Sequence, residues 1–219
     1  MISYDMIRTN PDIRAYISAA DASLEALGYT EHSFAHVTRV ATDAAEILAA
    51  LGYDPHTVEL ARIAGYMHDI GNLVNRVDHS QSGALLAFRV LDKMGMPPAD
   101  IAEIVTAIGN HDEGTGVPVS PLAAALIIAD KSDVRRSRVR NTDPQSFDIH
   151  DRVNYSVEQS VLTVSHADAS ISLSLTVDTA ISAVMEYFEI FLERMLLCRR
   201  AAERLGTTFR LDINGQRLL

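Results

Sequence analysis

The sequence predicts a mainly α protein, with a helical body over residues 1–140 and a small α+β extension over residues 141–219 packed on that body. Three observations lead to this prediction. Apolar residues recur at helical spacing from about residue 11 to residue 140. Apolar and polar residues then alternate between residues 157 and 177, as in half-buried strands. A long apolar helix is expected after them, over residues 180–205.

Five helices of the body follow in order. The first has an apolar stripe from Val37 to Leu51 and ends at Gly52, and the second follows Asp54-Pro55 and stops at Gly71. The third and fourth are expected over residues 80–94 and 98–110. The fifth opens at Ser120-Pro121, where proline occupies the favoured first helical position.

The extension begins with a polar stretch, residues 141–148, predicted as a linker or lid. Antiparallel strands are expected over residues 157–164 and 171–177, with a turn near residues 166–169. A further alternating segment, residues 209–213, precedes the turn signal Asn214-Gly215. The long helix before it is apolar over a wide arc, which indicates packing on the strands or, if partly exposed, a homodimer interface.

Composition narrows the class of partner. The formal net charge of −10 argues against a nucleic acid polymer or an anionic membrane as partner. Positive charge is clustered between Lys131 and Arg140, so a small anionic substrate remains compatible. No apolar run approaches the roughly 20 residues of a membrane span. A single cysteine, Cys198, and no signal-peptide pattern lead us to expect a reducing, cytoplasmic location.

The dipeptide His-Asp occurs three times, at His68, His111 and His150, so its position must decide its meaning. His36, His68, His111 and Asp130 each extend a helix stripe that is otherwise apolar, and we expect them to point into the core. An unpaired buried carboxylate costs several kcal/mol, so Asp130 needs a cation or several donors nearby.

Each of these residues has an ordinary explanation when taken alone. A buried histidine is usually only hydrogen-bonded, and Asp130 would pair with an arginine. His32, one turn before His36, is an alternative to it, and His150-Asp151 lies in a polar stretch and is interpreted as solvated. Four such residues on separate helices instead favour a metal site, with the mixed nitrogen and oxygen ligands that Fe, Mn, Zn or Ni accept.

The order of these motifs resembles a known family. His36-Val-Thr-Arg39, then His68-Asp69-Ile70-Gly71, then Ala129-Asp130 resemble the H…HD…D signature of HD-domain phosphohydrolases, over about residues 31–140. The resemblance implies a helical HD-domain bundle that binds a divalent metal. Its implied ligands are His36, His68, Asp69 and Asp130.

Two further segments are similar to those of dinuclear members, namely the bacterial diadenosine tetraphosphate hydrolases and, more loosely, the HD-GYP phosphodiesterases. They are His79-Ser-Gln-Ser-Gly83 and the segment that ends in His111. The resemblance implies a second metal on His79 and His111, with Asp69 bridging, while a mononuclear site stays open. The chain departs from HD-GYP enzymes at Gly116-Val117-Pro118, and Asn72 stands where many members have lysine.

The resemblance implies a phosphohydrolase that cleaves a phosphate ester or anhydride of a nucleotide or small phosphorylated metabolite. Its cofactors would be two divalent ions, with Fe or Mn favoured and Zn, Ni or Mg as alternatives. Asp69 is the expected catalytic ligand. Lys131 and Arg135 are expected to compensate phosphate charge because they follow Asp130 on the same predicted helix, although a solvated charged face explains them equally well. Asp112 or Glu113 would orient water or hold a ligand histidine through its second nitrogen.

Two alternatives stay open. The chain could be a nucleotide-binding regulatory protein with a metal-occupied but weakly active site. This hypothesis is motivated by Asn72 and by the extension, to which the family resemblance does not reach. Within the enzymes, the alternative is a phosphodiesterase acting on dinucleotides. Metal-dependent turnover separates the first alternative from an enzyme, and substrate size separates the second.

Overall fold

The computed structural model describes residues 2–219, and its helical content confirms the mainly α prediction. The body contains α1 (Tyr4–Thr9), α2 (Pro11–Ala26), α3 (Phe34–Ala50), α4 (Pro55–Met67), the short 3-10 helix η1 (Ile70–Leu73), α5 (His79–Lys93), α6 (Pro98–Gly109) and α7 (Pro121–Ser132). The five predicted helices correspond to α3 to α7. The six-residue α1 was not predicted, because so short a helix shows little periodicity.

Capping residues explain where several helices begin. The side chains of Asn10, Asp54 and Ser120 accept hydrogen bonds from backbone N–H groups in the first turns of α2, α4 and α7. Proline follows each of these three caps at a position where a helix needs no N–H donor. The helix starts are therefore fixed locally by the sequence.

Two glycines allow the close approaches that assemble the centre of the body. A Cβ on Gly65 of α4 would lie 2.7 Å from the backbone of Ala41, so glycine lets α4 cross tightly over α3. A Cβ on Gly71 would overlap the carbonyl oxygen of His79. Together they bring His68 close to both α3 and the start of α5.

The extension contains the 3-10 helices η2 (Arg136–Arg138) and η3 (Pro144–Ser146), then α8 (Ile149–Ser156), β1 (Val157–Ser165), β2 (Ser170–Val177), α9 (Val184–Arg204), β3 (Thr208–Ile213) and β4 (Gln216–Arg217). The sheet order is β1-β2-β3-β4. The pair β1–β2 is antiparallel, as expected, and the pair β3–β4, which was not predicted, is antiparallel as well. The pair β2–β3 is parallel, because α9 carries the chain back to the end of the sheet at which β2 begins.

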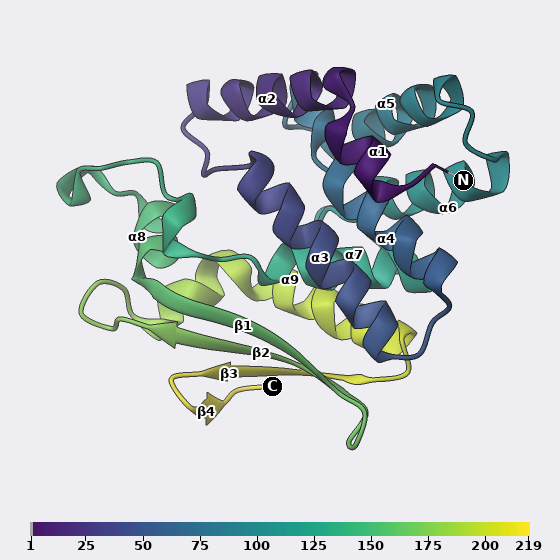
Figure 1. Cartoon of the computed structure of the whole chain (residues 1–219). Helices are drawn as coiled ribbons and strands as arrows, with labels where there is room; N and C mark the ends of the chain where they lie inside the picture. The colour runs from purple at the N-terminus through teal and green to yellow at the C-terminus, as the bar shows by residue number, and fades with distance from the viewer. Residues whose placement is uncertain (1) are drawn as a thin grey trace.

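Helix α9 lies between the sheet and the helices of the body (Figure 1). It packs on α7 with one side and on β3 with the other. Tyr187, Phe191 and Met195 are buried in this layer, whereas Met185 and Leu192 are exposed. The wide apolar arc of α9 is thus largely explained by packing on two neighbours. Across the described residues, no helix is long and apolar enough to cross a membrane.

Candidate metal centre

Six side chains that the sequence singled out meet where five helices converge. His36 lies in the first turn of α3, His68 caps the end of α4, and Asp69 directly follows it. The other three lie at the start of α5, just after α6 and in the last turn of α7, respectively His79, His111 and Asp130. The four imidazoles and Asp69 are buried. The structure therefore brings together all six residues proposed as ligands.

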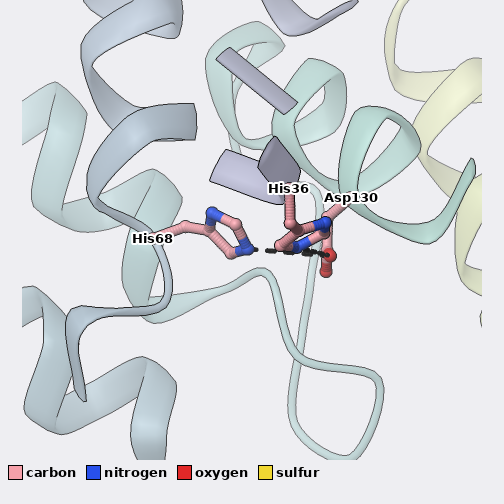
Figure 2. A group of neighbouring side chains, drawn as sticks. All are labelled: His36, His68 and Asp130. Carbon is pink, nitrogen blue, oxygen red and sulfur yellow. Dashed lines mark ion pairs between the residues drawn. The ribbon is translucent and has the colours of Figure 1, made fainter. Parts of the chain in front are cut away.

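One part of this centre, here called the His36 end, consists of His36, His68, Asp130 and one oxygen of Asp69. The Nε2 atoms of His36 and His68 lie 3.3 and 3.6 Å from Asp130 Oδ1 (Figure 2). They lie 3.5 and 3.2 Å from Asp69 Oδ2. Two imidazole nitrogens and two carboxylate oxygens thus face a common point.

The other part, here called the His79 end, consists of His79, His111 and the second oxygen of Asp69. Asp69 Oδ1 lies 3.6 Å from His79 Nε2 and 4.0 Å from His111 Nε2. The two Nε2 atoms are 3.1 Å apart. Asp69 therefore faces both ends of the centre, one oxygen to each.

The Nδ1 partners fix the orientation of all four rings. Nδ1 of His68, His79 and His111 lies 2.8, 3.1 and 2.6 Å from a backbone carbonyl oxygen. Because a carbonyl oxygen only accepts, each Nδ1 donates a proton and each neutral ring keeps a lone pair on Nε2. His36 Nδ1 likewise lies 2.8 Å from Asp133 Oδ2. All four lone pairs are turned into the centre.

This arrangement fits a cation. Among the described residues, the buried Nε2 atoms of His36 and His68 have no hydrogen-bond partner. At the His79 end, two nitrogens that both carry lone pairs face each other, and His79 Nε2 has a donor nearby, Arg76 Nη1 at 3.3 Å. Buried acceptors without donors are costly, and a divalent ion would satisfy them. The ligand atoms of His36, His68 and Asp130, and those of His68, Asp69 and His111, lie within 4.8 Å of one another.

Electrostatics differ between the two ends. With no cation bound, burial lowers the pKa of His68, but the carboxylates of Asp69 and Asp130 outweigh it and raise that pKa to about 10, so the ring attracts a second proton at Nε2, the position that a metal ion would take instead. At the His79 end burial prevails: it lowers the pKa of His79 and, together with neighbouring His68, brings the pKa of His111 well below its ordinary value. The His36 end therefore attracts positive charge more strongly.

Asp133 supports the His36 end and was missed in the sequence. Besides its bond to His36, it accepts hydrogen bonds from Arg135 at 2.5 and 2.9 Å, and Arg138 Nη1 lies 4.0 Å away. Burial raises the pKa of Asp133, but the bonds from His36 and Arg135 outweigh it and lower that pKa. A carboxylate behind a metal-binding histidine fixes its ring and raises its basicity.

The two cations expected to meet phosphate are both bound to carboxylates. Lys131 Nζ lies 2.7 Å from Asp130 Oδ2 and 2.6 Å from Glu113 Oε2. The expectation that Arg135 lies on the same helix as Asp130 is wrong, because α7 ends at Ser132 and Arg135 turns to Asp133.

The carboxylates expected behind the ligand histidines take other places. Glu113 bridges Lys131 to Arg194 of α9, with Arg194 Nε 2.8 Å from Glu113 Oε1. Asp112 lies 3.9 Å from His79 Nε2, on the inner side of that ring. The position behind a ring is held at His36 by Asp133 and at the other three rings by backbone carbonyls.

A cavity of about 360 Å³ opens onto the centre. Asp69, His79 and Asp130 form part of its wall, and the extension contributes residues from α8 and α9. His150 is exposed, as expected, but it lines this cavity together with Asp151. The extension thus encloses the space in front of the candidate ligands.

The match to a family model agrees with the motif. Residues 33–135, which contain all six candidate ligands, match the model of the HD domain. The chain is 26% identical to the uncharacterized protein MJ1020 of Methanocaldococcus jannaschii, over 71% of this chain and 69% of that protein. It is 27% identical to a predicted HD superfamily hydrolase from an uncultured Thermotogales bacterium, whose crystal structure it matches with a TM-score of 0.46 over 57% of this chain and 68% of that one.

Proposed function

We propose that this chain, whose residues 33–135 match the model of the HD domain, is a metal-dependent phosphohydrolase. One observation carries the proposal: four buried imidazoles have their Nδ1 protons engaged elsewhere and turn their Nε2 lone pairs towards Asp69 and Asp130. A divalent ion bound there would act as a Lewis acid on water and on a phosphoryl oxygen. Fe or Mn are the proposed ions, and two are proposed because Asp69 faces both ends.

The protein's own groups hold this site in place. Lys131 binds Oδ2 of Asp130, which leaves Oδ1 directed at His36 and His68. Asp133 keeps the ring of His36 from rotating. Because these ligands are already in position, no rearrangement is needed when the ion and the substrate bind. Fixed charges of this kind stabilise a transition state most effectively.

The size of the cavity bears on the substrate. A volume of about 360 Å³ lies at the small end of the range for ligand sites. It favours a mononucleotide or another small phosphorylated metabolite over a dinucleotide. Diadenosine tetraphosphate hydrolases and HD-GYP enzymes act on dinucleotides, so the size of this cavity does not support a closer relation to either group.

Hydrolysis assays test the proposal. Purified protein supplied with Mn²⁺ or Fe²⁺ is expected to release phosphate from at least one member of a panel of sugar phosphates, mononucleotides and dinucleotides. The variants His68→Ala and Asp69→Ala should lose this activity while still folding. His56→Ala is the matched control, since this half-buried histidine pairs with Asp100 away from the centre. Tight nucleotide binding without turnover would favour the regulatory alternative and contradict the proposal.

A further inference from the structure

The cavity in front of the centre contains four cationic side chains, which differ in how they are engaged. They are Arg76, Lys131, Arg138 and Arg194. Lys131 is paired with Asp130 and Glu113, Arg194 with Glu113, and Arg138 lies near Asp133. Within the described part of the chain, Arg76 alone of the four has no carboxylate within 4.0 Å. One positive charge in the cavity is therefore left without an internal counter-charge.

Three neutral contacts hold Arg76 at the edge of the His79 end. Its Nη1 lies 3.3 Å from His79 Nε2 and 3.4 Å from Asn72 Oδ1. Its guanidinium lies over the ring of Tyr29, 5.7 Å from the ring centroid. Both hydrogen bonds are long for a charged donor, so they are readily exchanged for a stronger acceptor.

Asn72 connects this arginine to the centre. Its side-chain amide donates to Asp69 Oδ1 at 3.0 Å, and its amide oxygen faces Arg76. The side chain at position 72 carries no charge, and the cation stands four residues later, at position 76. The positive charge is thus present in the cavity, although the residue at position 72 is neutral.

We propose that Arg76 is a catalytic residue that binds the phosphoryl group of the substrate at the His79 end. This inference rests on the proposed function. It assigns to Arg76 the contact with phosphate that was expected of Lys131 and Arg135, because both of those side chains pair with carboxylates. A guanidinium presents a planar fork of N–H donors that matches two phosphate oxygens, and it stays charged at any physiological pH. An anion placed between the two ends of the centre lies within reach of Nη1, because that atom is already 3.3 Å from His79 Nε2.

The test uses inorganic phosphate as the probe and compares three variants of the metal-loaded protein. Arg76→Met removes the charge at similar length, and Arg76→Lys keeps it. Arg62→Met is the matched control, because Arg62 is also half-buried and lies 5.7 Å from a tyrosine ring centroid, that of Tyr4, but does not line the described cavity. Calorimetry measures phosphate binding, elemental analysis measures bound metal, and kinetics separate kcat from KM.

Arg76→Met is expected to weaken phosphate binding by about 10-fold or more and to lower kcat/KM by on the order of 100-fold, as when one donor to a developing charge is removed. Bound metal should stay at the wild-type level, Arg76→Lys should recover part of both losses, and Arg62→Met should change neither. Unchanged phosphate binding in Arg76→Met would overturn the inference, and so would a loss of metal, which would make Arg76 a support of His79. Calorimetry measures phosphate binding even if no substrate is hydrolysed. A failure of the proposed function would therefore appear in the kinetics alone, and a failure of this inference would appear in phosphate binding.

Discussion

The His36 end and the His79 end are built from similar ligands but differ in charge. At the His36 end, two imidazoles face two carboxylate oxygens, and a third carboxylate, Asp133, stands behind His36. At the His79 end, two imidazoles share one oxygen of Asp69 and lie beside the guanidinium of Arg76. Lys131 and Arg135 each pair with one of the carboxylates at the His36 end. The pKa of His68 is nevertheless raised there, whereas the pKa values of His79 and His111 are lowered at the other end, so the His36 end attracts positive charge more strongly.

Because of this difference, we expect the two ends to bind metal ions with different affinities. Electrostatic attraction grows with the number of nearby opposite charges, particularly where water is excluded. The His36 end should hold an ion tightly in the resting protein. The His79 end should hold one more weakly and should leave room for the substrate phosphate beside Arg76. Four predictions test this contrast, from the largest expected effect to the smallest.

The largest effect should come from removing one ligand at each end. His36→Ala should lose all tightly bound metal and lower kcat by at least about 1,000-fold, or about 4 kcal/mol of transition-state stabilisation. His79→Ala should lose no more than one ion and about 10- to 100-fold in kcat, because the His36 end stays intact. Elemental analysis and steady-state kinetics give both numbers. Equal metal loss in the two variants would remove the distinction between the ends.

A smaller effect should follow from changing the outer carboxylates. Asp133→Asn keeps the shape of the side chain but weakens its hold on His36, so metal affinity should fall by about 10- to 100-fold, as for other outer partners of ligand histidines. Activity should return when more metal is supplied. Asp112→Asn is the counterpart at the other end, where Asp112 lies 3.9 Å from His79 Nε2, and should leave tight binding unchanged. A titration with Mn²⁺ in which both variants bind like the wild type would contradict the role of Asp133.

The predictability of these residues follows from where they lie in the chain. His36, His68 and Asp130 interrupt apolar helix stripes, so helical periodicity alone marked them as buried. His79 opens a helix in a polar segment and was found only through the family resemblance. Asp133 lies beyond the end of α7, where no periodic pattern constrains a side chain. Its position depends on how the chain leaves that helix.

In the extension, too, the sequence predicted only the elements that have a strong periodic pattern. The strands β1, β2 and β3 and the helix α9 have strong alternating or helical patterns and were predicted close to their observed bounds, whereas the two-residue β4 was not predicted. The eight-residue α8 was missed because its polar sequence, Ile149–Ser156, carries only a short apolar stripe. The parallel pairing of β2 and β3 depends on the path of α9 across the sheet, which a strand pattern does not specify.

Metal removal should affect stability mainly through the His36 end. An ion present at about 100 times its dissociation constant stabilises the folded state by about 2.7 kcal/mol. For a chain of this size, chelation should therefore lower Tm by about 5–10 °C. His79→Ala should keep most of this difference between metal-loaded and chelated protein, whereas His36→Ala should show almost none. Thermal unfolding in the presence and absence of a chelator measures it, and a large shift in His36→Ala would assign the tight ion elsewhere.

The smallest effect concerns His32, the alternative to His36 that the sequence left open. The ring of His32 meets His36 edge-on, with centroids 5.4 Å apart, and its Nδ1 lies 2.6 Å from the carbonyl oxygen of Thr30. It belongs to neither group of candidate ligands found in the described chain. His32→Ala should therefore retain all bound metal and lose only two local contacts, the edge contact with His36 and the hydrogen bond to Thr30, together about 2 kcal/mol of stability. Because burial lowers the pKa of His32 well below its ordinary value, the ring is neutral near pH 7 and its removal takes no charge from the centre. Loss of the tight ion in this variant would make His32 a ligand of the His36 end and would require that end to be redrawn.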